Sequence, residues 1–335
     1  MESASGGSNP PTPAIERHMN ATLKVFCGRA NPVLGGAICR YLGVQPGKVE
    51  IYDFPDGETC CQLQENVRGA DVFIVQPTSP PAHKNLMEML ILLETMKRSS
   101  AARMTAVLPY FGYARQDRKD KPRVPITSKL VANLITSAGA NRILAMDLHA
   151  PQIQGFFDIP VDHLFATPVL LEEFRRQGFR DMVIVSPDAG GVERARAIAS
   201  RCGASLAIID KRKPDPKRTT DKVEVMNVIG DVAGRPCILV DDMLDTGSTM
   251  MRAAQALLER GAAEVDAACT HVLLSGDAAR RLAESPIRKV FVTDTIDIGE
   301  KRQSCPKLVT LSVAGLLGEA IQRIHNDDSV SSLFV

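Results

Sequence analysis

Several features that assign a chain to a function class are missing from these 335 residues. No Gly-Lys-Ser or Gly-Lys-Thr occurs, which excludes a Walker-type nucleotide-binding loop. No apolar run approaches the roughly 20 residues of a membrane span, because Glu88 and Glu94 interrupt the best candidate. The 40 Lys and Arg nearly balance the 39 Asp and Glu, and the net charge of +1 gives no support for a nucleic-acid or membrane partner. We therefore expect a soluble globular protein that binds neither nucleic acid nor membranes.

Cysteine motifs for metal or redox chemistry are missing as well. The 8 cysteines include the neighbours Cys60 and Cys61, and no pair has the Cys-x-x-Cys spacing. Most lie beside apolar residues, which favours reduced thiols in the core of a cytoplasmic protein over disulfides. Residues 1–20 lack the basic start and apolar segment of a secretory signal and are rich in Ser, Gly, Pro and Asn. This composition predicts a disordered extension.

What the chain does contain is an alternation of short β-branched runs with amphipathic segments. One such segment, Ser128–Ala138, has four apolar residues on one face and Gly139 just past its end, which predicts a helix. Nine runs predict buried strands: Leu23–Phe26, Asp71–Val75, Met104–Leu108, Arg142–Met146, Met182–Ser186, Ser205–Ile209, Cys237–Val240, Val265–Cys269 and Val290–Thr293. This alternation is typical of α/β folds, in which helices flank a mostly parallel sheet on both faces.

Nine strands exceed an average single sheet, and the pattern breaks near residues 162–168. We therefore expect two related α/β domains, over residues 21–165 and 166–324. The tail of residues 325–335 is expected to pack on the first domain.

The most informative segment is residues 240–249, Val-Asp-Asp-Met-Leu-Asp-Thr-Gly-Ser-Thr. An apolar run precedes it and an amphipathic helical pattern follows, so the segment is predicted to lie at the carboxyl end of a strand. There, the free N–H groups of the turn and helix attract an anion, while Asp241 and Asp242 can accept hydrogen bonds from vicinal hydroxyls. The acidic Asp245 suggests that the anion arrives with a metal ion. The segment indicates a phosphorylated sugar; an Asp-rich capped turn is the alternative.

A second candidate site is the loop Tyr113–Lys121, which follows a predicted strand and combines cations, an amide and acids. Arg115 offers fork-shaped donors for phosphate oxygens, and Gln116 can contact a base or ribose edge. The mixture favours a bound triphosphate. Taken alone, the loop is more commonly explained as a charged surface loop.

Two further polar residues follow predicted strands. His149, in Asp-Leu-His, and Asp188, in Ser-Pro-Asp-Ala-Gly-Gly, could share a divalent ion through one imidazole and one carboxylate. Mg²⁺ beside phosphates keeps several waters and takes few protein ligands, so two suffice. The alternatives are a hydrogen-bonded core histidine and a helix N-cap.

Considered in order along the chain, these motifs resemble the ribose-phosphate diphosphokinase (phosphoribosyl diphosphate synthetase) family, of the phosphate-regulated class. The resemblance extends from Lys24 to the last residue. Its motifs are Phe54–Glu58, Tyr113–Asp120, Asp147–Ala150, Gln154–Pro160, Ser186–Gly191, Lys211–Pro214, Val240–Thr249 and Ser329–Phe334. It implies two phosphoribosyltransferase-type domains with ATP and ribose 5-phosphate between them. It also implies transfer of the diphosphoryl group of Mg-ATP to the anomeric hydroxyl, giving phosphoribosyl diphosphate and AMP for nucleotide biosynthesis.

The same resemblance implies roles for individual residues. The ligands of ribose 5-phosphate would be Asp241, Asp242, Asp245, Thr246, Gly247, Ser248 and Thr249. The ATP contacts would be Arg115, Gln116 and Asp120, with Phe54, Asp56 and Glu58 from a neighbouring subunit. Mg²⁺ would be held by His149 and Asp188, and the catalytic cations on a closing loop would be Lys211 and Lys213.

Regulation and assembly are implied too. Inorganic phosphate and ADP are expected effectors at a site between subunits, with Arg68, Arg123 and Ser329 at matching positions. Surface salt bridging is the alternative role of these residues. The resemblance implies a homo-oligomer, a hexamer by family pattern.

The chain departs from the family pattern at two of these positions. Lys213 stands where the family has Arg, and Ser248 stands where it has Gly, with Gly247 one place earlier. These departures keep open a non-catalytic regulatory subunit that binds nucleotide and an active partner. The segment 241–249 alone would also permit a phosphoribosyltransferase that consumes phosphoribosyl diphosphate, but the two-domain length and the loop at 113–120 argue against it. Formation of AMP from ATP and ribose 5-phosphate separates both from the synthetase.

Overall fold

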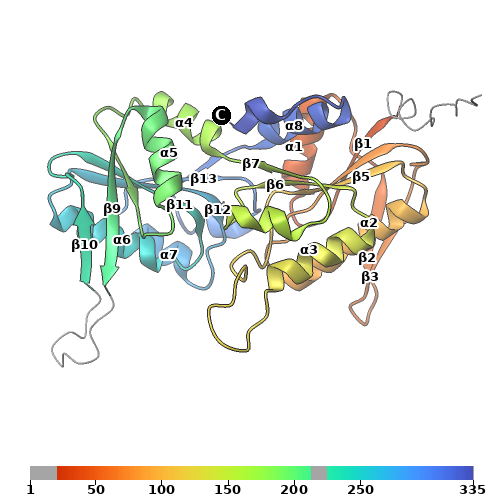
Figure 1. Cartoon of the computed structure of the whole chain (residues 1–335), viewed down its shortest axis with the longest axis horizontal. Coiled ribbons are helices and arrows are strands. Elements are labelled where there is room, and N and C mark those ends of the chain that lie inside the picture. Colours follow the sequence, from red (N-terminus) through yellow and green to blue (C-terminus); the bar gives the residue numbers. More distant parts are fainter. Residues whose placement is uncertain (1–20, 213–224, 335) are drawn as a thin grey trace, which may run out of the picture.

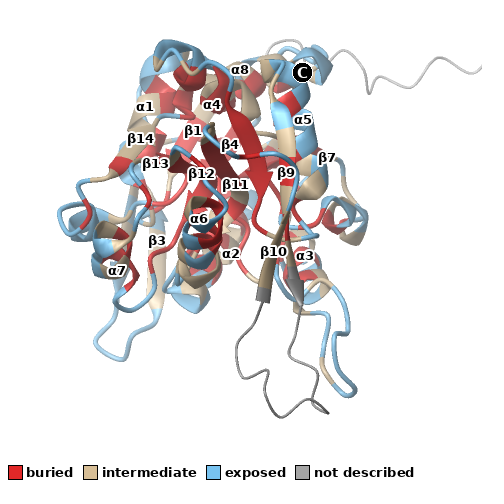
Figure 2. Ribbon diagram, turned by 90° about the vertical axis from the view of Figure 1, so that its left-hand side faces the viewer, coloured by how far each residue is buried: buried red, intermediate tan, exposed pale blue. Residues whose placement is uncertain are grey.

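The computed structural model describes residues 21–212 and 225–334. Within these residues the two halves of the chain form two main sheets, and helices cover both faces of each main sheet (Figure 1). Figure 2 shows that the buried residues follow the strands and the inner faces of the helices. The predicted α/β fold class is confirmed. The expected extension over residues 1–20 lies outside the described residues.

The first sheet has five parallel strands in the order β1-β4-β5-β6-β7. They are β1 (Leu23–Cys27), β4 (Asp71–Val75), β5 (Arg103–Leu108), β6 (Arg142–Met146) and β7 (Val161–Leu164). Because side chains alternate between faces, β5 sends Ala106 and Leu108 to one cluster and Val107 to the other. One face packs against α2 (Ala82–Arg98) and α3 (Thr127–Ala138), and the other against α1 (Pro32–Leu42) and α8 (Ala314–His325). A separate hairpin, β2 (Val49–Asp53) and β3 (Thr59–Leu63), lies beside α2.

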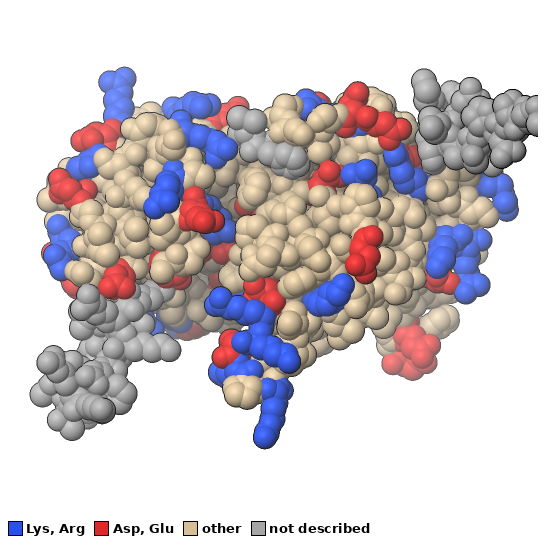
Figure 3. Space-filling view, viewed as in Figure 1, with Lys and Arg blue, Asp and Glu red and all other residues tan. Residues whose placement is uncertain are grey.

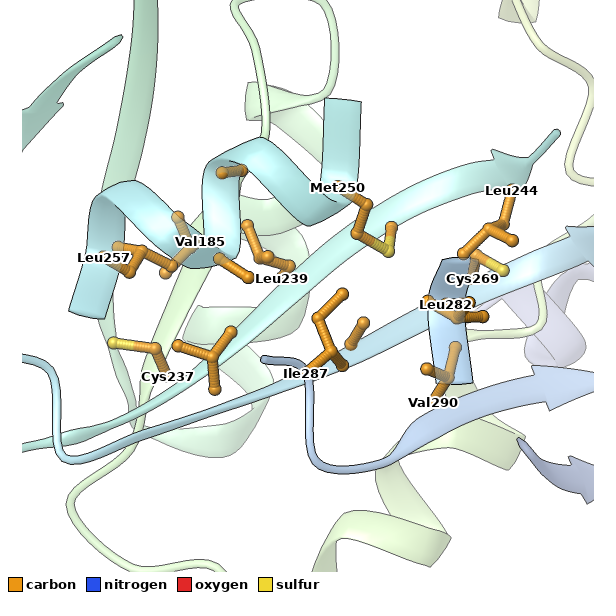
Figure 4. Packing of buried hydrophobic residues seen from close by; sticks show 14 of the residues in the cluster. Val185, Cys237, Leu239, Leu244, Met250, Leu257, Cys269, Leu282, Ile287 and Val290 are labelled. Atoms are coloured by element: carbon orange, nitrogen blue, oxygen red, sulfur yellow. The ribbon is translucent and has the colours of Figure 1, made fainter. Parts of the chain in front are cut away.

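The second sheet has seven strands in the order β10-β9-β8-β11-β12-β13-β14, and only β10 runs antiparallel to its neighbour. They are β8 (Val183–Ser186), β9 (Ser205–Arg212), β10 (Val225–Ile229), β11 (Pro236–Leu244), β12 (Glu264–Val272), β13 (Val290–Thr293) and β14 (Leu308–Leu311). Helices α4 (Thr167–Arg176) and α5 (Val192–Cys202) cover one face. Helices α6 (Ser248–Glu259) and α7 (Ala278–Glu284) cover the other, where Leu257 and Leu282 pack on Leu239 and Val290 (Figure 4).

The end of the chain returns to the first sheet. Helix α8 packs beside α1, and its Leu317 and Ile321 belong to the same buried cluster as Leu34 and Ile38 (Figure 1). The segment that packs on the first half therefore begins near Val313, and not at residue 325 as predicted from the sequence. The cause is the apolar face of α8, which completes the cover that α1 alone leaves open.

All nine predicted strands are present, and the helix predicted over residues 128–138 is α3. Strand β11 is longer than predicted, because its ladder with β12 continues past Val240 and pairs Asp241 with Cys269 and Met243 with His271. Asp241 and Asp242 therefore lie on the strand, where the sequence suggested a turn. Among the described residues, no helix is both long and apolar enough to span a membrane.

Candidate functional site

A cavity of about 740 Å³ lies between the two halves of the chain, at the carboxyl ends of β8 and β11. These two strands are neighbours, but the chain leaves β8 toward β9 and leaves β11 toward β12, on opposite sides. Such a reversal opens a crevice that α/β sheets use for ligands. The cavity is lined by Arg115, Asp117, Arg118, His149, Ala150, Gln152, Asp188, Ala189, Gly190, Gly191, Arg194, Asp210 and Asp241–Met250.

The paired carboxylates of β11 face two cations from different elements. Nδ1 of His149 lies 2.7 Å from Oδ2 of Asp242, which joins the turn after β6 to the second sheet. Nη1 of Arg194, on α5, lies 3.4 Å from Asp242 and 3.7 Å from Asp241. Asp242 is almost fully buried, so these partners compensate a charge that burial alone would disfavour.

These contacts separate the proton affinities of the two acids. Burial and the neighbouring Asp242 raise the pKa of Asp241 to about 7. Burial would also raise the pKa of Asp242, but the hydrogen bond with His149 and the charge of Arg194 lower it below its ordinary value. The same hydrogen bond raises the pKa of His149. Of the two acids, Asp241 therefore takes up a proton more readily than Asp242.

The turn between β11 and α6 is shaped for an anion. Gly247 has φ +71°, which a side chain would strain, and it is the N-cap of α6 without a side-chain cap of its own. The first N–H groups of α6 are thus available to a ligand. Ser248 Oγ accepts a hydrogen bond from Nη2 of Arg281, on α7, at 3.0 Å. The positive φ falls on Gly247, so Ser248 occupies its position without strain.

The loop predicted to bind a triphosphate reaches the cavity only in part. Arg115 lines it and donates to Oδ2 of Asp245 at 2.8 Å, which links the two halves across the cavity. Gln116 instead accepts a hydrogen bond from Thr127 through Oε1 at 2.5 Å, at the start of α3. Asp120 is exposed farther along the loop, where Lys and Arg side chains gather at the lower edge of Figure 3.

The two candidate metal ligands line the same cavity. Asp188 accepts backbone hydrogen bonds through Oδ1 from Gly190 at 3.0 Å and Gly191 at 3.2 Å, so it also fixes the turn into α5. His149 uses Nδ1 for Asp242, which leaves Nε2 as its possible metal donor. Nowhere in the described chain do three His, Cys, Asp or Glu side chains come close enough to hold an ion by themselves. This donor set fits Mg²⁺ that takes its other ligands from phosphates and water.

The other predicted site residues lie outside this cavity lining. Phe54, Asp56 and Glu58 are exposed in the β2–β3 hairpin, where the Phe54 ring contacts Tyr52 at a centroid distance of 5.3 Å. Arg68 and Arg123 are exposed in loops of the first half, and Ser329 is exposed in the segment after α8. The backbone of Lys211 belongs to β9, one residue before the strand ends at Arg212, and Lys213 lies outside the described residues.

Arg194 is a cavity residue that the sequence interpretation missed, together with Asp117, Arg118 and Gln152. The sequence did contain an indication of its role. Arg194 lies in the first turn of α5, where the helix dipole disfavours a positive charge. An unfavourable position of this kind suggests that the charge serves a partner outside the helix. That partner is the Asp241–Asp242 pair.

Comparisons with known proteins agree with this geometry. Residues 23–139 match the family model of the N-terminal domain of ribose phosphate pyrophosphokinase, and residues 210–335 match the phosphoribosyl synthetase-associated domain. A ribose-phosphate pyrophosphokinase of Chromobacterium violaceum is 53% identical over 314 residues, 93% of this chain and 95% of that protein. The corresponding protein of Agrobacterium fabrum is 54% identical over 313 residues, 93% of this chain and all of its own length (100%).

A solved structure agrees as well. The phosphoribosylpyrophosphate synthetase of Mycobacterium smegmatis superposes with a TM-score of 0.85 and 42% identity, covering 91% of this chain and 99% of its own. The resemblance derived from the motifs is thereby confirmed over nearly the whole chain, and the chain belongs to the ribose-phosphate pyrophosphokinase family.

Proposed function

We propose that this protein transfers the diphosphoryl group of ATP to the anomeric hydroxyl of ribose 5-phosphate. The hydroxyl oxygen attacks the β-phosphorus, the bond from that phosphorus to the α-phosphate oxygen breaks, and AMP leaves as the hydroxyl proton is lost. The products are phosphoribosyl diphosphate and AMP. One observation carries the proposal. A single cavity holds the two carboxylates at the end of β11 and the turn before α6, both from the second half, together with Arg115 and His149 from the first half.

The second half supplies the sugar-phosphate subsite. Asp241 and Asp242 accept hydrogen bonds from the ribose hydroxyls, which a charged carboxylate binds more strongly than a neutral group does. The turn from Asp245 to Thr249 surrounds the 5-phosphate, whose charge is stabilised by the N–H groups of α6 and by the helix dipole. Strand β11 and helix α6 are regular elements, so the sugar is fixed before the reaction.

The first half supplies the nucleotide subsite. Arg115 contacts the phosphates of ATP. To do so, it must replace its hydrogen bond to the Asp245 carboxylate with one to a phosphate oxygen, and both acceptors are anionic oxygens. Gln116 and Asp120 contact other parts of ATP, and Lys211 and Lys213 bring positive charge to the transferring group. Diphosphoryl transfer depends on such positioning and charge neutralisation more than on covalent catalysis.

The magnesium ligands in this proposal are His149 and Asp188. When bound, Mg²⁺ supplies positive charge to the phosphate oxygens of ATP and of the departing AMP. The hydrogen bond that Nδ1 of His149 donates to Asp242 fixes the ring of His149 and directs its Nε2 away from β11.

Several broader proposals go with this function. The halves are two domains, with α8 and the tail returning to the first. Phe54, Asp56 and Glu58 reach the adenine in a neighbouring subunit of a homo-oligomer, since they are exposed and lie outside the cavity lining of their own chain. Phosphate and ADP act as effectors through Arg68, Arg123 and Ser329. The eight cysteines are free thiols, which supports a cytoplasmic location.

The test is AMP formation from ATP, Mg²⁺, ribose 5-phosphate and inorganic phosphate, measured for the wild type and for a variant with Asp241→Asn and Asp242→Asn. Asn keeps the size of each side chain and removes the charge. Two charge-assisted hydrogen bonds of about 1.5–3 kcal/mol each predict a kcat/KM roughly 10² to 10⁴ times lower. Asp231→Asn, an exposed acid of the second half, is the matched control.

The outcomes separate the three functions. AMP from the wild type and the control but not from the double variant supports the synthetase. ADP in place of AMP contradicts diphosphoryl transfer. A wild type that binds ATP and yields neither product points to a regulatory subunit, and one that consumes phosphoribosyl diphosphate with a free base points to a phosphoribosyltransferase.

A further inference from the structure

A buried polar cluster joins the two halves beside the cavity. Its members are Asp147, directly after β6, Thr270 and His271 on β12, Thr293 at the end of β13, and Thr295 two residues beyond that end. Each of these residues is at most 3% exposed. Polar side chains stay in such an environment only when their hydrogen bonds are satisfied, so the cluster has a defined arrangement.

Asp147 is the centre of this cluster. Its Oδ2 accepts hydrogen bonds from the Thr270 hydroxyl at 2.6 Å and from the backbone N–H of Ala166 at 2.8 Å. Its carbonyl oxygen lies 3.1 Å from Nε2 of His271. One residue of the first half is therefore held through both its side chain and its backbone by two consecutive residues of the second half.

The protons of the cluster can be assigned from these contacts. A carbonyl oxygen only accepts, so Nε2 of His271 carries the hydrogen that it shares with Asp147. Burial lowers the pKa of His271, which keeps the ring neutral, so its Nδ1 accepts from the Thr295 hydroxyl at 3.0 Å. The Thr293 hydroxyl donates to the carbonyl oxygen of Thr270 at 2.7 Å. Every hydroxyl thus has an acceptor; Thr295 has a second one in the carbonyl oxygen of Thr270 at 3.2 Å, and Thr293 has a second one in the Thr295 hydroxyl at 3.1 Å.

The cluster also stabilises an unusual backbone conformation. Asp147 has φ +40°, a left-handed value that disfavours residues other than glycine by about 1–2 kcal/mol. The next N–H, of Leu148, donates to Nε2 of His163 at 2.9 Å, which fixes the turn from its other side. This turn leads directly to His149, whose Nδ1 lies 2.7 Å from Asp242.

Two hydrogen bonds between the halves, Asp147 with Thr270 and His149 with Asp242, lie on neighbouring strands of the second sheet. Strand β12 is the neighbour of β11, with Asp241 opposite Cys269 and Met243 opposite His271, so Thr270 lies at the level of Asp242. A shift of the turn at Asp147 would therefore move His149 relative to Asp242. We propose that Thr270 is a positioning residue, whose hydroxyl holds Asp147 in its left-handed turn so that His149 meets Asp242 and faces the cavity. This inference rests on the proposed function, in which His149 serves the transfer reaction.

The test compares Thr270→Val with Thr270→Ser. Valine has the shape of threonine but no hydroxyl, so T270V removes only the donor to Asp147, whereas serine keeps it. We expect T270V to lower kcat for AMP formation by about 10- to 100-fold, as a misplacement on the order of 1 Å does. KM for ribose 5-phosphate stays within about twofold, because Asp241 and the α6 turn are untouched, and T270S recovers most of the rate.

A matched control and a double-mutant cycle separate positioning from general destabilisation. Thr105→Val also removes a fully buried threonine hydroxyl, but that hydroxyl has no partner. T105V is expected to keep the wild-type rate. In a His149→Ala background, T270V is expected to change kcat by less than about twofold, because its effect passes through a side chain that is no longer present.

Two results would overturn the inference. One is a T270V protein with a lower thermal midpoint and an unchanged kcat, which assigns the hydroxyl to stability alone. The other is an equal loss of rate by T270V with and without His149, which means that Thr270 acts by another route. Both results can be told apart from a failure of the proposed function, because in that case the wild type itself would form no AMP.

Discussion

At the scale of single residues, Ser248 is the position where the sequence is expected to depart from the family pattern, and the structure gives its hydroxyl a partner. Its hydroxyl accepts from Arg281, whose guanidinium also lies 3.8 Å from Asp277. The serine therefore ties a cation of α7 to the turn proposed to bind the 5-phosphate. A glycine at this position offers no such contact.

Replacing this hydroxyl is expected to weaken sugar-phosphate binding. In Ser248→Gly, Arg281 loses its anchor beside the turn, and we expect KM for ribose 5-phosphate to rise about 2- to 5-fold with kcat unchanged, the effect of one partly exposed hydrogen bond. Arg281→Gln is expected to give the same change. Arg280→Gln, on the same helix but paired with Asp277 and Glu284 in solvent, is the control. An unchanged KM in both test variants contradicts the role.

The sequence predicted the cavity-lining residues that a local motif contains and missed charged residues that tertiary packing brings beside them. Asp241, Asp242 and the turn after them occupy one short segment, so their chemistry could be recognised without a fold. Arg194 and Arg281 belong to α5 and α7, and their distance from β11 depends on how these helices pack on the sheet. No sequence period encodes that distance.

At the scale of elements, the five strands that the sequence did not predict all lie outside the centres of the two main sheets. Strands β7, β10 and β14 lie at sheet edges, and β2 and β3 form a separate hairpin. Edge strands bury fewer residues, so their hydrophobic signal is weak; β2 buries none of its five residues completely. The central strands, such as β4 with all five residues buried, were predicted from their continuous apolar runs.

Gly112 illustrates how a single glycine fixes an element. It begins the loop that carries Arg115, and its N–H donates to the Thr78 hydroxyl at 2.7 Å. A Cβ at this position would lie 2.3 Å from the backbone oxygen of Thr78, so an alanine forces two backbone segments apart. The close approach therefore sets where the loop starts.

We expect Gly112→Ala to reduce the free energy of unfolding by about 1–3 kcal/mol, the usual effect of overpacking, and to raise KM for ATP because Arg115 moves. Urea unfolding and steady-state kinetics measure the two effects. Gly155→Ala is the control, since a Cβ there meets no atom within 4 Å. Equal stability of both variants would show that the loop yields without strain.

At the scale of the whole molecule, the halves are joined by both polar and apolar contacts. Besides the Asp147 cluster, Tyr110 from the first half packs against Leu273 and Ile296 from the second. The side chain of Asn31 donates to the carbonyl oxygen of Asp294 at 2.8 Å. Unfolding of either half exposes this shared interface, so its titratable groups influence the stability of the whole chain.

The buried histidines give this interface a pH dependence of known sign. Burial lowers the pKa of His271 and of His163 below the ordinary value of 6.5. The unfolded chain therefore binds a proton first as the pH falls, so the stabilisation is complete above about pH 6.5 and is lost below it. His149 has a raised pKa and acts in the opposite direction: its contribution is present at low pH and is lost as the pH rises through its folded pKa.

His271→Gln isolates the first effect, because Gln can still donate to the Asp147 carbonyl but does not titrate. From pH 7 to pH 5.5, we expect the wild-type free energy of unfolding in urea to fall more steeply than that of H271Q. The difference in slope is at most about 1.4 kcal/mol per pH unit, the limit for one proton. His83→Gln removes an exposed imidazole and serves as the control. Parallel curves for the wild type and H271Q would mean that His271 takes up its proton equally in the folded and unfolded chains, which the buried contacts of its ring to Asp147 and Thr295 oppose.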